Sequence, residues 1–255
     1  MKHKKIGIVL SGGGARGFAH IGVLKALNEN EIFPGMISAV SAGSIVGCLY
    51  ADGKTPDEIF TVFSHLDLFK FLRFYRPKFG MLKAEGIKKL LVNNLSVKNL
   101  EELKIPLSVC ATNFSKARTD YFNTGSIVDS VLASSAIPML LKPYLINGNM
   151  YVDGGLMNNL PVEPLEGKCD LIIGVNVNSV HEVTRFRSFR NYTDRVLHLA
   201  LRANVNKNIP KCDIYIEPPN LMDFHLLKVS LAREIFEAGY NHTLKLIDEI
   251  NKKVH

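Results

Sequence analysis

Ser41 lies in the stretch Ala39 to Gly43, AVSAG, which nearly matches the Gly-x-Ser-x-Gly turn that carries the nucleophile of many serine hydrolases. That turn needs small residues two positions before and after the serine, because a strand and a helix pass close together there. Gly43 meets this requirement, whereas Ala39 adds one methyl group. The alternative is that Ser41 only caps a helix beginning near Ala42, although Ser44 stands where a capping box would have Glu or Gln.

A serine hydroxyl becomes a good nucleophile only when a base takes its proton. Asp153 follows a short apolar run and precedes Gly154 and Gly155, two flexible residues that could present its carboxylate at a sheet edge. Asp-Gly is by itself also a common turn signal. A triad in the chain order Ser, Asp, His is the rival arrangement, and its histidine candidates carry no supporting motif: His181, His198, His225 and His242.

The stretch SGGGARG satisfies the pattern G-x-G-x-x-G through Gly12, Gly14 and Gly17, between a predicted strand and a predicted helix. A dinucleotide site would also need an acidic residue at the end of the second strand, where the sequence is AVSAG instead. Consecutive glycines also let backbone N–H groups approach a negative charge closely. We therefore expect a loop that binds an oxyanion, the alternative being a tight strand-to-helix connection only.

Strands and helices alternate along most of the chain. Apolar runs predict strands at 4–10, 35–40, 105–113, 118–125 and 169–177, and a hairpin at 145–155 with its turn at Asn147 and Gly148. Helical spacing predicts helices at 17–30, 43–53, 83–94, 126–138, 192–206 and 230–253, and another beginning at Thr55 and Pro56. This order predicts an α/β fold with a mostly parallel sheet, in which the glycine loop and Ser41 share the carboxyl edge.

The chain of 255 residues has 47% apolar and 22% charged residues, which fits one globular domain over 1–255. The four cysteines are more than forty positions apart without a C-x-x-C, so neither a metal site nor a disulfide framework is expected. The basic start and short apolar run at 1–10 lack a cleavage-like site, and we expect a cytoplasmic protein.

The net charge of +7 favours an anionic partner. In Leu68 to Phe79, LFKFLRFYRPKF, apolar side chains fall on one helical face and basic side chains on another. This pattern is typical of a helix that rests on an anionic membrane, and a core-packing helix is the alternative. The basic stretch Arg185 to Arg190 is less specific, and we expect no nucleic-acid partner.

Four motifs together resemble those of the patatin-like phospholipase family, in the family's order. They are GGGARG at Gly12 to Gly17, AVSAG at Ala39 to Gly43, ASSAIP at Ala133 to Pro138, and DGG at Asp153 to Gly155. The resemblance covers about residues 5 to 177 and is that of a compact bacterial-type member. It implies a three-layer α/β/α sandwich, with a helical part at 192–255 after the motifs.

The resemblance also implies a catalytic Ser–Asp dyad, with Ser41 as nucleophile and Asp153 as base. Its oxyanion hole would be formed by the glycine loop, Gly12, Gly13 and Gly14, with Arg16 beside it. Relatives hydrolyse fatty acyl esters of phospholipids, lysophospholipids or neutral lipids, usually without calcium at the catalytic centre, so no cofactor is expected. Because Ala39 departs from the family pattern, a weakly active or regulatory binding protein is the alternative, beside the triad hydrolase.

Overall fold

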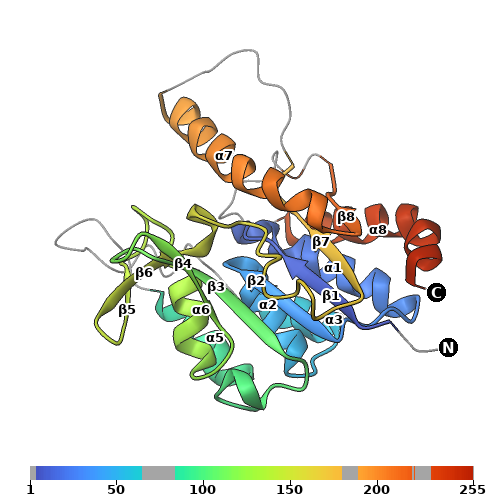
Figure 1. Cartoon of the computed structure of the whole chain (residues 1–255), viewed down its shortest axis with the longest axis horizontal. Coiled ribbons are helices and arrows are strands. Elements are labelled where there is room, and N and C mark those ends of the chain that lie inside the picture. Colours follow the sequence, from blue (N-terminus) through green and yellow to red (C-terminus); the bar gives the residue numbers. More distant parts are fainter. Residues whose placement is uncertain (1–3, 65–83, 180–188, 220, 222–230, 255) are drawn as a thin grey trace.

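The computed structural model describes residues 4–64, 84–179, 189–219, 221 and 231–254. These residues form an eight-stranded sheet with the order β5-β6-β3-β2-β1-β7-β8, and β4 pairs with β3 off this path (Figure 1). The strands are β1 (Ile6–Leu10), β2 (Met36–Val40), β3 (Leu107–Asn113), β4 (Arg118–Phe122), β5 (Tyr144–Ile146), β6 (Asn149–Asp153), β7 (Leu171–Val175) and β8 (Ile214–Ile216). The strands from β3 to β8 along this order are parallel, whereas β4 and β6 run antiparallel to β3.

The described helices connect these strands. They are α1 (Gly17–Glu29), α2 (Ala42–Ala51), α3 (Pro56–Ser64), α5 (Glu85–Asn94), α6 (Ile127–Ser134), α7 (Phe189–Asn208) and α8 (Ala232–Val254). Short 3-10 turns lie at Gly14–Arg16 (η1), Leu100–Glu102 (η2), Gly154–Leu156 (η3) and Ile209–Lys211 (η4). The predicted hairpin is present, and Asn147 and Gly148 at its turn have positive φ.

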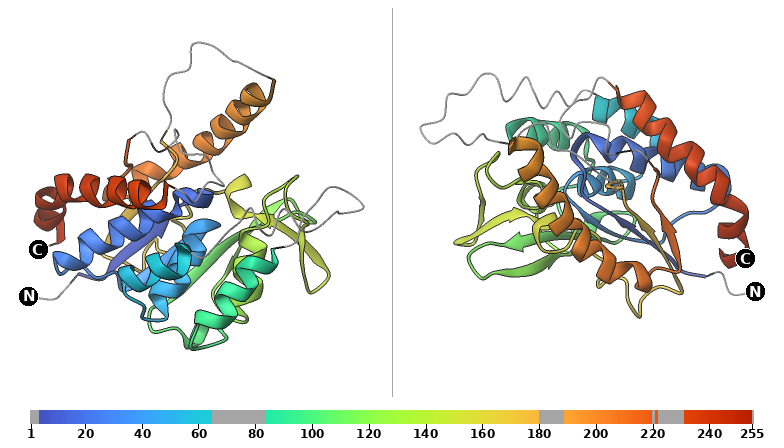
Figure 2. Two further views of the ribbon diagram at one scale, coloured as in Figure 1. Left: turned by 180° about the vertical axis from the view of Figure 1, so that it is seen from behind. Right: turned by 90° about the horizontal axis from the view of Figure 1, so that it is seen from above.

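Two apolar layers cover the sheet, because successive side chains of a strand point to opposite faces. Ile8 and Leu10 of β1 pack in the large cluster formed with α1, α2, α3, α5 and α8. Val9 of β1 packs on the other face with Leu160 and with Val205 of α7. Figure 2, seen from above, shows α7 and α8 on opposite sides of the sheet. The fold is therefore a three-layer α/β/α sandwich with a mostly parallel central sheet.

Strand β3 brings two distant turns together along one of its edges. β2 pairs with Leu107 to Cys110, and β6 pairs with Ala111 to Asn113, while β4 occupies the opposite edge. Because β2 and β6 run in opposite directions, their carboxyl ends meet where Cys110 pairs with Val40 and Ala111 pairs with Asp153. The residues directly after β2 and at the end of β6 are thus neighbours in space.

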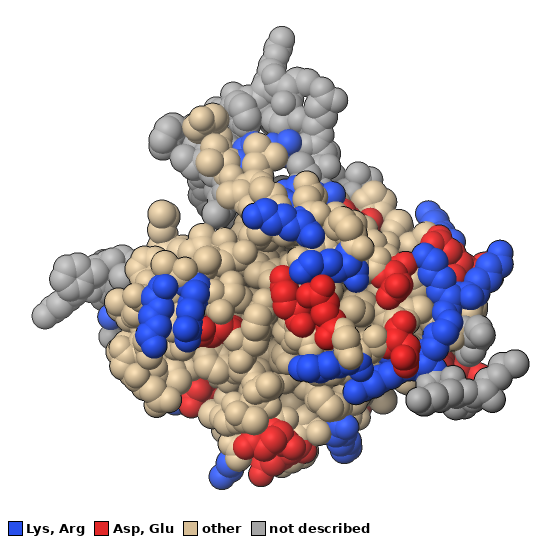
Figure 3. All heavy atoms as spheres, viewed as in Figure 1, with Lys and Arg blue, Asp and Glu red and all other residues tan. Residues whose placement is uncertain are grey.

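The predicted membrane-facing helix at Leu68 to Phe79 lies outside the described residues. None of the helices in the described part of the chain has an apolar stretch long enough to cross a bilayer. On the face drawn in Figure 3, acidic and basic side chains are interspersed over much of the surface.

Candidate active site

Ser41 occupies a sharp turn between β2 and α2. Its backbone has φ 52° and ψ −123°, a conformation that costs an L-residue on the order of 1–3 kcal/mol. The side chain makes no capping hydrogen bond to α2. Its Oγ instead donates to Oδ2 of Asp153 at 2.5 Å, so the structure does not support the capping alternative.

Asp153 is buried at the end of β6, and both of its carboxylate oxygens are engaged. Oδ1 accepts a hydrogen bond from the Gly155 N–H at 2.8 Å, which leaves Oδ2 facing Ser41. Burial raises the pKa of Asp153 to about 6, although the hydrogen bonds from Ser41 and Gly155 act in the opposite direction. A carboxylate with this pKa is ionised at neutral pH and is a stronger base than an exposed aspartate.

Close contacts, with backbone at Gly43 and Gly154 and with side chains at Gly17, explain three of the motif glycines. A Cβ on Gly43 would lie 2.4 Å from the Leu10 carbonyl oxygen, and one on Gly154 would lie 2.4 Å from the Cys110 carbonyl oxygen. A Cβ on Gly17, at the start of α1, would lie 3.2 Å from the Ala42 methyl group. The Ser41 turn therefore packs tightly against β1, and the Asp153 turn packs tightly against β3.

Ala39 is fully buried, and its methyl group points toward α2. A Cβ built on Gly47, one turn into that helix, would lie 3.4 Å from the methyl carbon. The Ala39 methyl group therefore has room opposite Gly47, where even an added Cβ would be in ordinary van der Waals contact with it.

The glycine loop lies directly against Ser41, since a Cβ on Gly12 would be 3.1 Å from the Ser41 Cβ. The Gly12 N–H donates to Asn159 Oδ1 at 3.1 Å and is already used. The N–H groups of Gly13 and Gly14 donate to no atom within the described ranges. The oxyanion hole stays a prediction, with Gly13 and Gly14 rather than Gly12 as its expected donors.

Arg16 is buried behind the loop rather than exposed to solvent. Its Nη1 donates to Asn178 Oδ1 at 3.0 Å, and Asn178 Nδ2 donates to the Gly12 carbonyl oxygen at 2.6 Å. Burial lowers the pKa of Arg16 to about 10, so it stays charged at neutral pH. Arg16 therefore supports the loop through Asn178.

The ASSAIP motif supports the Ser41 turn from α6. Ser134 Oγ accepts a hydrogen bond from the Ser41 N–H at 2.8 Å and donates to the Cys110 carbonyl oxygen at 2.6 Å. The Ala136 carbonyl oxygen accepts the Asp153 N–H at 2.9 Å. One short segment thus holds the backbone of both Ser41 and Asp153.

Asn159 and Asn204 also belong to the site, although none of the four sequence motifs contains them. Asn159 contacts the glycine loop, and its N–H donates to Asn204 Oδ1 on α7 at 2.9 Å. The adjacent pair Asn158 and Asn159, which begins three residues after Gly155, is a usable sequence signal for the first of these residues. Asn204 stands more than forty positions downstream in a helical pattern, where the sequence offers no such signal.

The histidine candidates do not complete a triad in the described structure. His242 lies on α8, whereas His181 and His225 fall outside the described residues, as does the side chain of His198. Among the described residues, the side-chain hydrogen-bond partner of Asp153 is Ser41. His20 is buried with Nε2 at 2.8 Å from the Ser11 carbonyl oxygen, and burial lowers its pKa to about 4.

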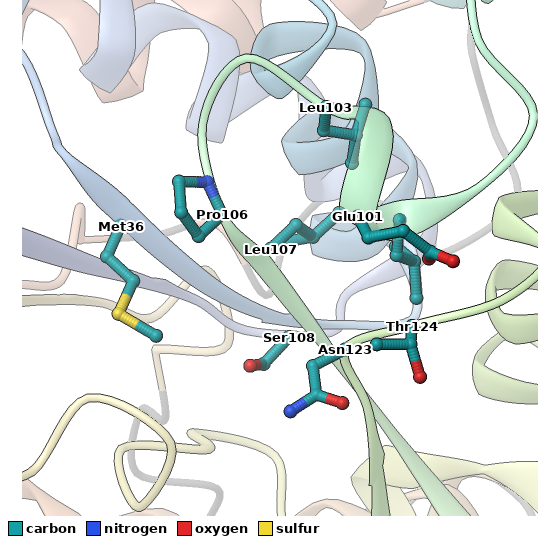
Figure 4. Close-up of a pocket in the computed structure, with 9 residues that line it drawn as sticks. Met36, Glu101, Leu103, Pro106, Leu107, Ser108, Asn123 and Thr124 are labelled. Carbon is teal, nitrogen blue, oxygen red and sulfur yellow. The ribbon is translucent and has the colours of Figure 1, made fainter.

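A separate cavity of about 250 Å³ lies at the opposite end of β2 and β3 from Ser41 (Figure 4). Met36, Pro106, Leu107, Ser108 and Asn123 are among the residues that line it. Within the described ranges, no group of three or more His, Cys, Asp or Glu side chains is arranged to hold a metal ion.

Comparison with known proteins agrees with this architecture. Residues 8–166 match the family model described as patatin-like phospholipase. The chain belongs to the patatin-like phospholipase family. The match includes the glycine loop, Ser41, Asp153 and Asn159, and it ends before α7.

The curated relatives include NTE family proteins and lysophospholipases. An NTE family protein of Mycobacterium tuberculosis is 33% identical over 178 residues, which cover 68% of this chain and 49% of the relative. The lysophospholipase nte1 of Aspergillus fumigatus is 26% identical over 284 residues, covering 98% of this chain and 18% of the relative. The lysophospholipase NTE1 of Cryptococcus neoformans is 35% identical over 209 residues, covering 76% and 12%. This chain therefore spans about half of the mycobacterial relative and less than a fifth of either fungal relative.

Two solved structures share the fold at low sequence identity. VipD from Legionella pneumophila superposes with a TM-score of 0.63 at 18% identity, over 98% of this chain and 67% of VipD. A chain of the ExoU–SpcU complex from Pseudomonas aeruginosa superposes with a TM-score of 0.53 at 14% identity, over 99% and 52%. These similarities support the α/β/α architecture.

Proposed function

We propose that this chain is a serine acyl hydrolase that cleaves fatty acyl esters of phospholipids or lysophospholipids. The observation that carries the proposal is the 2.5 Å hydrogen bond from Ser41 Oγ to the buried Asp153 carboxylate, in a strained turn under a glycine loop. Strained backbone at a nucleophile is a feature of active sites. Family membership and the lysophospholipases among the relatives support a lipid ester as substrate.

In the proposed mechanism, Asp153 accepts the Ser41 proton while Oγ attacks the ester carbonyl carbon. The N–H groups of Gly13 and Gly14 stabilise the tetrahedral oxyanion, to which each donor typically contributes about a hundredfold to a thousandfold in turnover. The proton then passes to the leaving alcohol, and the acyl group stays on Ser41. Asp153 then takes a proton from water as that water attacks the acyl-enzyme, and it returns the proton to Ser41 Oγ when the fatty acid is released.

Apolar side chains beside the dyad fit an acyl substrate. Leu156 and Met157 follow the Asp153 turn directly and are both 41% exposed. Met139, three residues after the Ala136 contact to Asp153, is 95% exposed. A cytoplasmic location and peripheral contact with an anionic membrane stay predictions.

Active-site labelling combined with ester hydrolysis tests the proposal. A fluorophosphonate probe should label the wild-type chain and leave Ser41→Ala unlabelled. We expect Asp153→Asn to lose turnover of short-chain and lysophospholipid esters by at least about a thousandfold, because the serine loses its base. Circular dichroism should show that both variants fold.

The outcomes separate the rival functions. Activity retained in Asp153→Asn but lost in a variant of His181, His198, His225 or His242 to alanine would assign a triad. A wild-type chain that neither reacts with the probe nor hydrolyses esters would be a regulatory binding protein. The space for the Ala39 methyl at Gly47 speaks against that second alternative.

A further inference from the structure

Asn159 sets the spacing between the glycine loop and the Asp153 turn. Its side chain is buried, and Oδ1 accepts the Gly12 N–H at 3.1 Å. The same oxygen lies so close to both backbone segments that a Cβ on Gly12 would be 2.6 Å away and one on Gly155 would be 2.7 Å away. One amide oxygen therefore touches both segments that face the nucleophile.

Asn204 on α7 holds the same turn with two hydrogen bonds. Its Oδ1 accepts the Asn159 N–H at 2.9 Å, and its Nδ2 donates to the Gly155 carbonyl oxygen at 3.1 Å. Gly155 in turn donates its N–H to Asp153 Oδ1 at 2.8 Å. Asn204 is thus two hydrogen bonds away from the carboxylate that faces Ser41.

The carboxyl-terminal half of α7 gives Asn204 a fixed support. Val205 is buried against the sheet with Leu160. Asn208 Nδ2 donates to the Leu160 carbonyl oxygen at 2.8 Å and to Asn158 Oδ1 at 3.1 Å. This part of the chain lies beyond residue 166, where the family match ends, so a segment outside the matched region reaches into the site.

We propose that Asn204 is a positioning residue for acyl transfer at Ser41, acting through Gly155 and Asn159. It fixes the Asp153 turn and the glycine loop relative to each other, so that base and oxyanion donors keep their places around the nucleophile. This proposal rests on the proposed function. Loss of the two hydrogen bonds would displace both partners of Ser41, and a shift of about 1 Å can lower a rate about a hundredfold.

The test compares Asn204→Ala with Asn206→Ala on the same helix. The Asn206 side chain is exposed and makes no hydrogen bond to the described residues, and both substitutions change helix propensity equally. We expect Asn204→Ala to lower kcat for a soluble short-chain ester by about tenfold to a hundredfold, with KM changed less than about threefold. Fluorophosphonate labelling of Ser41 should slow in proportion, and Asn206→Ala should match the wild type in both assays.

A second variant keeps the proposal testable if Asn204→Ala does not fold. Asn204→Asp retains an acceptor for the Asn159 N–H but places an oxygen against the Gly155 carbonyl oxygen, so we expect the same loss of kcat. Wild-type kcat in folded Asn204→Ala or Asn204→Asp, with Ser41→Ala inactive, would overturn this proposal and leave the proposed function intact. Turnover that persists in Ser41→Ala would overturn both.

Discussion

At the scale of single residues, the two carboxylate oxygens of Asp153 have different hydrogen-bond partners. Oδ1 is held by the Gly155 backbone, and Oδ2 is left for the Ser41 hydroxyl. The motif residues are identifiable in the sequence because each ends an apolar run, Ser41 two positions before Gly43 and Asp153 directly before Gly154. The basicity of Asp153 is not readable there, because it depends on burial that only the packed fold creates.

The raised pKa of Asp153 predicts the pH at which activity is lost. The base must be ionised, and burial raises the pKa of Asp153 to about 6, so kcat/KM should fall about tenfold per pH unit below pH 6. Above about pH 7, kcat/KM should no longer change, because Asp153 stays ionised. An unperturbed aspartate would place the same limb near pH 4.

The profile is best measured from pH 4.5 to 9 with an uncharged ester, so that the substrate does not titrate. Circular dichroism at each pH separates loss of ionisation from acid unfolding. A limb near pH 4 in folded protein would show that Asp153 is not the group whose ionisation limits the reaction.

At the scale of elements, the site depends on how two strands share an edge of β3. The alternation of strands and helices predicts that the glycine loop and Ser41 lie at one sheet edge. It does not predict that β6 runs antiparallel to β3 and ends opposite β2, because β3 pairs with β6 across about forty positions of sequence and with β2 across seventy. The same holds for Asn204, whose place in the site depends on how α7 crosses the sheet.

The sharp turn between β2 and α2, which carries Ser41, predicts different outcomes for two single substitutions. Gly43→Ala should lower turnover by about a hundredfold or more, because its Cβ would lie 2.4 Å from the Leu10 carbonyl oxygen and 2.6 Å from that of Ser11. Ala39→Gly should stay within about threefold of the wild type, since the methyl already has room beside Gly47.

Steady-state turnover of one soluble ester measures both variants, with titration by a fluorophosphonate to count active sites. A rise of tenfold or more in Ala39→Gly would show that the methyl group slows the enzyme. Wild-type turnover in Gly43→Ala would mean that the turn between β2 and α2 tolerates a side chain at position 43.

At the scale of the whole molecule, α8, which is the last described helix, packs closely against α1, the first helix. A Cβ on Gly22 of α1 would lie 2.1 Å from the Phe236 carbonyl oxygen. A Cβ on Gly239 of α8 would lie 2.2 Å from the Ala19 carbonyl oxygen. The two helices therefore approach each other closely at a reciprocal pair of glycines, on the face of the sheet opposite α7.

This contact predicts that Gly239→Ala destabilises the entire chain. Overpacking against backbone costs about 1–3 kcal/mol, which outweighs the gain of about 1 kcal/mol in helix propensity where the clash is not relieved. Each kcal/mol lowers Tm by about 2–4 °C in a chain of this size. Asn241→Ala, at an exposed position of the same helix, is the matched control and should leave Tm unchanged or slightly raised.

Thermal unfolding followed by circular dichroism and by residual ester hydrolysis should give one coincident transition if 1–255 is a single domain, as the sequence predicts. A Gly239→Ala variant that loses helical signal well below the temperature at which activity is lost would show instead that α8 unfolds independently of the site.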